Sequence, residues 1–250
     1  MVSRHASTIT AALQSSGANI QFALNVSDLD VAIPDVATRG SFVHRVLTGS
    51  RLPSVDPVKR WDAANVAAFV SVLPLTSAAL DCGAYNSPVP LMLAAMGFET
   101  VHGIDLNPHA PWMPTPASGA SVQWSCQNIV ATAFESNSFD LVTCCSTIEH
   151  GVDWDAFLNE TGRLLRPGGW LYLSTDLVPD DAPNNDGTAF GLPWWPLRPR
   201  DLNDRVEQIR AHGFSIPDVE PFVVPEQLPI EFLGQRLGFV AFTAQFGAPQ

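Results

Sequence analysis

Short runs of apolar residues alternate with longer segments in which apolar positions recur every three or four residues, and this pattern begins near residue 78. Alternation of this kind is typical of parallel strands that are joined by crossover helices. Five strands are predicted in the first part of this region, at 78–81, 100–105, 121–125, 139–145 and 170–175. Two further strands, 218–224 and 238–246, are predicted as an antiparallel pair at the sheet edge.

Helices are predicted between these strands and before them. In the helix predicted over 62–73, Val66, Phe69, Val70 and Leu73 form an apolar stripe. The helix over 88–96 is expected to have Ser87 as its N-cap and Pro88 as its first residue. Two more helices are predicted, over 155–165, which the turn 166–169 (RPGG) ends, and over 202–212.

Two segments do not fit the alternation. Residues 1–60 are rich in Ser, Thr, Ala and Asp and are interpreted as an N-terminal extension that packs on the core or covers the site. The remainder, 61–250, is interpreted as one α/β domain with an insertion at 176–200, which is rich in proline. Within the insertion, Phe190, Trp194 and Trp195 form either an apolar wall over a substrate or an exposed packed loop, and Trp61 is a candidate to close the same cavity.

The composition favours a single large α/β domain, because 46% of the 250 residues are hydrophobic and 15% are charged. No run of about 18 apolar residues occurs, and the first residues lack the apolar stretch of a secretory signal, so a cytoplasmic protein without a membrane segment is expected. The four cysteines have no C-x-x-C spacing and are predicted to be buried thiols without a metal.

Acidic residues outnumber basic ones, 25 to 13, and the formal net charge is −12. There is no Lys or Arg between Trp61 and Gly162, and this stretch carries ten acidic residues. Nucleic-acid binding depends on basic residues that neutralise phosphates, so a nucleic-acid substrate is not expected. A cationic ligand is compatible with this charge.

Polar residues follow the predicted strands at the ends where open α/β sheets bind ligands. The first strand ends at Asp81, and a turn that contains Gly83 follows; the second strand ends at Asp105, an acid suited to the two hydroxyls of a ribose. Asn128 and Ile129 follow the third strand, and the run from Ser146 to His150 follows the fourth. Taken singly, Asp81 and Asp105 are also explained as residues that cap turns.

The segments LDCGAYNSP, GIDLNP, SFDLVTCCSTIEHG and LLRPGGWLYLST together resemble the class I S-adenosylmethionine-dependent methyltransferases, in particular the small-molecule branch of ubiquinone and menaquinone enzymes. The resemblance covers about 78–176. It implies a Rossmann-like, doubly wound seven-stranded mixed sheet, in the order 3-2-1-4-5-7-6 with helices on both faces. It also implies S-adenosyl-L-methionine as cofactor, a small-molecule acceptor and direct transfer without metal.

The same resemblance implies site residues. Asp81 and Gly83 would line the methionine end of the cofactor, Asp105 would hold the ribose hydroxyls, and Ser146 would lie beside the transferable methyl. Leu106, which follows Asp105, is also placed at the cofactor. Asn128 would meet the adenine amino group and the Ile129 amide a ring nitrogen. The family's second and third glycines are Tyr85 and Ser87 here, which also places these two residues at the cofactor.

Glu149 and His150 form the candidate acid–base pair. A base is required only where the acceptor loses a proton, and a histidine suits that role near neutral pH. The alternative is that both residues close the loop before the next helix. Asp153 and Asp155 are interpreted as helix-capping acids rather than metal ligands.

Two other functions compete with the transferase. The residues Tyr85 and Ser87 motivate a degenerate relative that binds or scaffolds a partner without catalysis. A nicotinamide-dependent oxidoreductase shares the glycine turn and the acid, but it requires G-x-G-x-x-G, of which CGAYNSP has one glycine.

Overall fold

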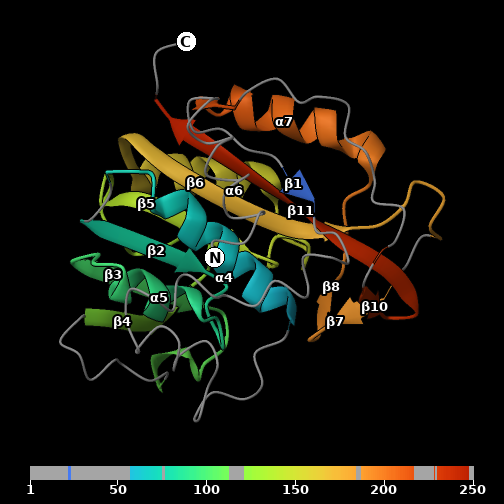
Figure 1. Cartoon of the computed structure of the whole chain (residues 1–250), viewed down its shortest axis with the longest axis horizontal. Coiled ribbons are helices and arrows are strands. Elements are labelled where there is room, and N and C mark those ends of the chain that lie inside the picture. The colour runs from blue at the N-terminus through green and yellow to red at the C-terminus, as the bar shows by residue number, and fades with distance from the viewer. Residues whose placement is uncertain are drawn as a thin grey trace, which may run out of the picture.

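The computed structural model describes residues 22–23, 57–74, 77–112, 121–183, 187–216, 228 and 230–247 of the 250-residue chain. A mixed sheet runs through the middle of the molecule (Figure 1). Its main path has the order β4-β3-β2-β5-β6-β11. The bounds are β2 Ala78–Cys82, β3 Thr100–Asp105, β4 Ser121–Cys126, β5 Phe139–Cys145, β6 Leu165–Leu177 and β11 Gln235–Phe246.

The predicted strand order is confirmed for the first five strands. Neighbours from β4 to β6 are parallel, and β11 pairs antiparallel with β6. The predicted strand at 218–224 lies outside the described residues. Three short strands instead pair with β11, namely β1 Phe22–Ala23, β9 Phe214–Ser215 and β10 Ile230–Phe232, so the described sheet has nine strands rather than seven.

Helices cover both faces of the sheet. Two of them, α4 (Pro57–Val70) and α5 (Val89–Ala95), contribute to a buried cluster on one face, and α6 (Trp154–Leu164) and α7 (Leu202–Ala211) contribute to a second cluster on the other. Figure 1 shows α4 and α5 on the near side of the strands. The doubly wound arrangement is therefore confirmed.

Helix boundaries differ from the prediction by a few residues. Helix α4 begins at Pro57, five residues before the predicted start, since proline suits the first turn of a helix. At α5 the N-cap is Pro88, so the prediction that Ser87 is the N-cap was wrong by one residue. The Ser87 hydroxyl nevertheless accepts a hydrogen bond from the Val89 amide (3.2 Å).

The start of α6 confirms the cap that was predicted there, because the Asp153 carboxylate accepts a hydrogen bond from the Ala156 amide (3.1 Å). At the other end, the predicted turn 166–169 lies inside β6, which begins at Leu165. The pairing shifts there by a bulge between Phe139 and Leu141. A side chain at Gly169 would meet the Arg166 carbonyl oxygen at 2.9 Å, so the bulge requires glycine.

The insertion splits into a buried and an exposed part. After β6 the chain forms a hairpin from β7 (Thr188–Ala189) and β8 (Leu192–Pro193). Trp194 is fully buried and belongs to the core under α4, whereas Trp195 is 60% and Phe190 88% exposed. The predicted wall of two tryptophans is therefore wrong for Trp194. Trp61 is likewise a core residue, 6.2 Å from Phe239 between ring centroids.

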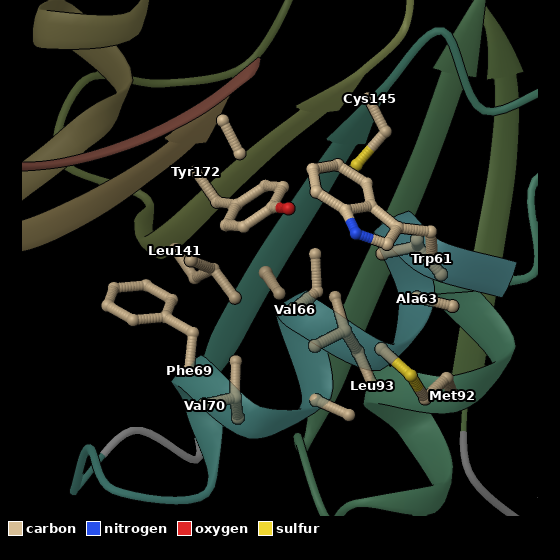
Figure 2. Close-up of a cluster of buried hydrophobic side chains, with 14 of the residues drawn as sticks. Trp61, Ala63, Val66, Phe69, Val70, Met92, Leu93, Leu141, Cys145 and Tyr172 are labelled. Carbon is tan, nitrogen blue, oxygen red and sulfur yellow. The ribbon is translucent and has the colours of Figure 1, made fainter. Parts of the chain in front are cut away.

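The core under α4 is built from large side chains of the helix and the sheet (Figure 2). The Phe69 ring meets Trp170 edge-on at 5.4 Å and lies 6.3 Å from Tyr172. Three of the four cysteines are buried as predicted, but Cys126 is exposed, and none forms a disulfide. Among the described residues, no helix is long and apolar enough to cross a membrane.

Candidate functional site

The carboxyl ends of β2, β3, β4 and β5 bring most of the predicted site residues to one edge of the sheet. Asp81 is near the end of β2 and is 1% exposed. Its carboxylate accepts a hydrogen bond from the Thr143 hydroxyl (2.6 Å) on β5. Asp81 pairs with Thr143, and Thr143 with Tyr172, so these three residues form a polar row across a face that is otherwise apolar.

The turn after β2 can only be made by glycine. Gly83 has a φ of +77°, and a side chain there would overlap the Thr147 hydroxyl. The amides of Gly83 and Ala84 both donate to the Ile104 carbonyl oxygen, at 2.9 Å each. The turn therefore bends over the end of β3 and brings its backbone toward Asp105.

Asp105 holds this turn in place. One carboxylate oxygen accepts from the Tyr85 amide (3.1 Å), and the other accepts from the Asn107 amide (2.8 Å), which is the predicted turn-capping contact. An ionised carboxylate has about four lone-pair sites, so each oxygen retains capacity for one more donor. Tyr85 thus meets the acid through its backbone, as a glycine would, and the remaining acceptor sites of the carboxylate still fit the two hydroxyls of a ribose.

Beyond Asp105 lie Leu106 and the two residues that were predicted to meet the adenine, Asn128 and Ile129. Leu106 is 56% exposed and offers an apolar surface beside the acid. Asn128 is exposed, and its side-chain oxygen accepts from the Val130 amide (3.2 Å). The Ile129 side chain is buried in the core under α6.

On the opposite side of the Gly83 turn, Ser146 follows β5 with a φ of +47°, a conformation that costs a non-glycine residue free energy. Its amide donates to the Ser174 carbonyl oxygen (3.0 Å), and its hydroxyl donates to the Asp62 carboxylate (3.1 Å). The Ser174 hydroxyl donates to the other Asp62 oxygen (2.5 Å). Asp62, which lies on α4 and is 0% exposed, therefore joins the site, although sequence reasoning missed it.

A signal for Asp62 did exist in the sequence. Asp62 lies one turn before Val66, on the same helical stripe as Phe69 and Val70, so a carboxylate occupies an apolar stripe that faces the sheet. An acid at such a position requires donors from the sheet. Ser146 and Ser174 supply them from 84 and 112 residues further along the chain.

The predicted acid–base pair has two separate environments. Glu149 is 2% exposed, and its carboxylate accepts from the Thr175 hydroxyl (3.1 Å) on β6. The partly buried His150 ring meets Phe190 edge-on, with 5.5 Å between ring centroids. The Trp195 amide donates to the Glu149 carbonyl oxygen (2.7 Å), so the hairpin is fastened directly to the loop that carries His150.

The ionisable groups under the site are strongly affected by burial. Burial raises the pKa of Tyr172 well above its usual value, and the charges of Asp62 and Cys145 raise it further. Burial also raises the pKa of Cys82, with smaller effects of Asp81 and Glu160. Within the part of the chain that the structure describes, no three His, Cys, Asp or Glu residues are placed to hold a metal ion.

Comparison with known proteins agrees with this geometry. Residues 80–173 match the family model of the methyltransferase domain. The ubiquinone biosynthesis O-methyltransferase of Xanthomonas axonopodis pv. citri is 34% identical over 106 residues, and that of Thiobacillus denitrificans is 33% identical over 102. The first alignment covers 41% of this chain and 44% of the relative, so the chain spans less than half the length of this curated relative.

Solved structures extend the likeness to more of the chain. A 1,6-didemethyltoxoflavin-N1-methyltransferase from Burkholderia thailandensis has a TM-score of 0.54 at 18% identity, and covers 92% of this chain and 96% of its own. The [4+2]-cyclase SpnF has a TM-score of 0.57 at 18% identity, with 86% and 94% covered. A SAM-dependent methyltransferase from Methanosarcina mazei has a TM-score of 0.52 at 20% identity, with 71% and 95% covered. Residues 80–173 thus match the methyltransferase domain family, and the described fold is the one found in S-adenosylmethionine-dependent methyltransferases.

Proposed function

We propose that this protein is an S-adenosylmethionine-dependent methyltransferase that acts on a small or medium-sized acceptor by direct in-line displacement. The observation that carries the proposal is the arrangement of Gly83, Asp105 and Ser146 at neighbouring strand ends, inside the segment that matches the methyltransferase domain. The relatives that match this segment are named O-methyltransferases, which supports the same reaction class.

The strand order supports a specific direction for the cofactor. The ends of β4, β3, β2 and β5 follow one another, and four adjacent strands span about 14 Å. An extended adenosyl amino acid fits along such a row. Its adenine would meet Leu106, Asn128 and the Ile129 amide beside β3 and β4, and its ribose hydroxyls would meet Asp105.

The methionine end would then lie over β2, against Asp81 and the Gly83 turn, with Tyr85 and Ser87 on the far side of that turn. The reacting methyl would point toward Ser146, at the end of β5. The cofactor supplies a methyl group on a positively charged sulfur, which needs no further activation. The role of these residues is to hold that methyl in line with the acceptor atom and to exclude water.

His150, supported by the loop of Glu149, is proposed as the group that takes a proton from an oxygen or nitrogen acceptor. Its ring lies beside the exposed Phe190, so a planar or apolar acceptor held by the hairpin would be close to it. We also propose that 61–250 forms the transferase domain, that 1–60 and the insertion at 176–200 shape the acceptor site, and that the enzyme is cytoplasmic. A nucleic-acid acceptor is disfavoured by the charge of the chain.

Binding of the cofactor tests the proposal before any acceptor is known. Calorimetry with S-adenosylmethionine and S-adenosylhomocysteine is expected to give saturable heat, and a ligand at about a hundred times its Kd should stabilise the fold by about 2.7 kcal/mol. Absence of both heat and thermal stabilisation would overturn the transferase and favour a non-catalytic binding protein. A fluorescence change with reduced nicotinamide dinucleotide would favour the oxidoreductase.

A further inference from the structure

Two hairpins of the structure carry a large apolar residue at a turn position that disfavours it. In the β7–β8 hairpin, the two turn residues are Phe190, with a φ of +56°, and Gly191, with a φ of +79°. In the β10–β11 hairpin they are Leu233, with a φ of +48°, and Gly234, with a φ of +74°. A two-residue turn with positive φ at both positions is typical of type I′, which favours Asn, Asp or Gly at its first position. A bulky residue there costs the folded state free energy.

The same hairpins expose apolar side chains. They lie next to each other, because the Trp194 ring contacts the Phe232 ring edge-on at 5.4 Å between centroids (Figure 1). Of the large apolar side chains that the structure describes, five are exposed, and four of these lie on the two hairpins or directly after them: Phe190, Leu192, Trp195 and Leu233. Phe190 is the most exposed, at 88%. Exposed apolar patches mark binding surfaces, so a strained and exposed ring indicates a role outside the fold.

The β7–β8 hairpin holds Phe190 beside the candidate acid–base loop. The Phe190 ring meets the His150 ring edge-on, with 5.5 Å between ring centroids. A side chain at Gly151 would meet the Pro193 ring at 3.1 Å, so the second strand of the hairpin lies directly on this loop. Trp194, which is fully buried, anchors the end of the hairpin in the core. The position of the strained ring is therefore fixed relative to His150.

We infer that Phe190 contacts the methyl acceptor and selects planar, conjugated acceptors over saturated ones of the same size. The inference rests on the proposed function, because that function places the acceptor between Ser146 and the His150 ring. Aromatic rings attract one another when they are edge-on or offset, with centroids about 4.5–7 Å apart. Phe190 and His150 have this geometry, and a planar acceptor beside them extends it. A saturated ring is thicker and has no π-face, so it gains less from the same position.

The position and the charge favour a small acceptor over other occupants of this patch. A second copy of the chain or a lipid surface would also cover exposed apolar side chains. Neither occupant would require the strained ring to lie on the His150 ring. An anionic lipid surface is also opposed by the net charge of −12.

Phe190→Asn separates contact with the acceptor from a role in the fold. Asparagine suits the first position of this turn, so the Tm of the variant should rise by about 2–4 °C in thermal unfolding. Leu233→Asn is the matched control, because it makes the same change at the same turn position of the other hairpin, and its Tm should rise as well. A fall in Tm for Phe190→Asn alone would show that the ring supports the fold, and would overturn the inference.

The binding test compares two ligands that differ in planarity. Calorimetry on the complex of the whole chain with S-adenosylhomocysteine measures the Kd of naphthalen-2-ol and of decahydronaphthalen-2-ol, which have the same carbon skeleton and oxygen position. Binding is compared rather than turnover, because the two hydroxyl groups differ in reactivity. The wild type and Leu233→Asn should bind the planar ligand about fivefold more tightly than the saturated one. Phe190→Asn should lose this preference through weaker binding of the planar ligand, and Phe190→Tyr should retain it.

Several outcomes would overturn the inference. They are a wild-type complex that binds neither ligand or both equally, an unchanged Kd for the planar ligand in Phe190→Asn, and equal losses in Phe190→Asn and Leu233→Asn. A dimer in sedimentation, or binding to neutral phospholipid vesicles, that Phe190→Asn abolishes would assign the patch to another occupant and would also overturn it. In each of these cases S-adenosylhomocysteine still binds, whereas failure of the proposed function is seen as absence of that binding.

Discussion

The contacts of the buried and partly buried carboxylates differ between the two ends of the central sheet. At the amino end, Asp140 accepts from Arg166 (2.7 Å) and from the Ala78 amide (2.9 Å), and so ties the starts of β5, β6 and β2 together. Glu160 on α6 pairs with Arg163 (2.7 Å), whose carbonyl oxygen accepts from Asn137, just before β5. These acids have cationic partners, and their contacts fix the fold.

At the carboxyl end, neutral groups donate to the acids. Serine hydroxyls donate to Asp62, the Thr175 hydroxyl to Glu149, and the Trp194 indole to Asp176 (2.6 Å). These hydrogen bonds orient the carboxylates. The difference teaches that ion pairs hold the acids at the amino end, whereas hydrogen bonds from neutral groups orient acids at the carboxyl end, where the candidate site lies.

The largest effect is expected at the carboxyl end, from Gly83→Ala. The new side chain would overlap Thr147 and the residue would keep a positive φ, so the free energy of unfolding should fall by about 3 kcal/mol and cofactor affinity by more than about a hundredfold. Gly97→Ala is the control, because Gly97 also has a positive φ but open space around it. Calorimetry and urea unfolding measure both effects. Wild-type cofactor affinity in Gly83→Ala would show that the Gly83 turn does not contact the cofactor.

The amino end is expected to respond to pH through Glu160. Its hydrogen bonds to Arg163 lower its pKa from 4.5 to about 2. A lowered carboxyl pKa gives stability that is complete above about pH 4.5 and is lost as the pH falls toward 2, and a shift of this size corresponds to at most about 3 kcal/mol. Glu160→Gln should therefore be less stable at pH 7, with a gap that narrows by pH 3 in urea unfolding.

The affinity of Glu160→Gln for the cofactor tests whether the amino end of the sheet is independent of the site. Because Glu160 belongs to the fold rather than to the site, Glu160→Gln should bind S-adenosylmethionine with wild-type affinity at pH 7. A loss of affinity larger than the loss of stability would show that the two ends of the sheet are coupled.

The sequence predicts the residues at the carboxyl ends of the strands better than the contacts between the helices and the sheet. Apolar runs and the polar residues that follow them locate β2, β3 and β5 together with Gly83 and Asp105, because strand ends are local features. Asp62 was missed because its partners are distant in the chain. Its position on an apolar stripe signals a buried acid but does not identify Ser174.

The insertion shows the same limit. Its prolines and aromatic residues predict an irregular segment, yet composition does not say which of two adjacent tryptophans faces the core. Trp194 is buried because its indole reaches Asp176, whereas the amide of Trp195 reaches the Glu149 carbonyl and its ring stays exposed. Only the tertiary contacts determine this choice.

Trp194→Phe tests a neutral donor at the carboxyl end. The ring still fills the core, but the hydrogen bond to the buried Asp176 carboxylate is lost, so the free energy of unfolding should fall by about 2 kcal/mol. Thermal and urea unfolding measure the change. Asp176→Asn should cost less in the Trp194→Phe background than in the wild type, because the contact between the two residues is already lost there. Additive losses would show that Trp194 contributes by packing alone.

The smallest effect is expected at Asp153, an acid that lies near the candidate site but serves the fold. Asp153 also lies beyond the end of β5, but it caps α6 through the Ala156 amide. Asp153→Ala should lower the free energy of unfolding by about 1 kcal/mol and leave the Kd of S-adenosylmethionine unchanged, because the cap serves the helix alone. Asp153→Asn keeps the accepting oxygen and should restore most of the stability. If Asp153→Asn instead lost as much as Asp153→Ala, the carboxylate charge at the helix start would matter more than the hydrogen bond.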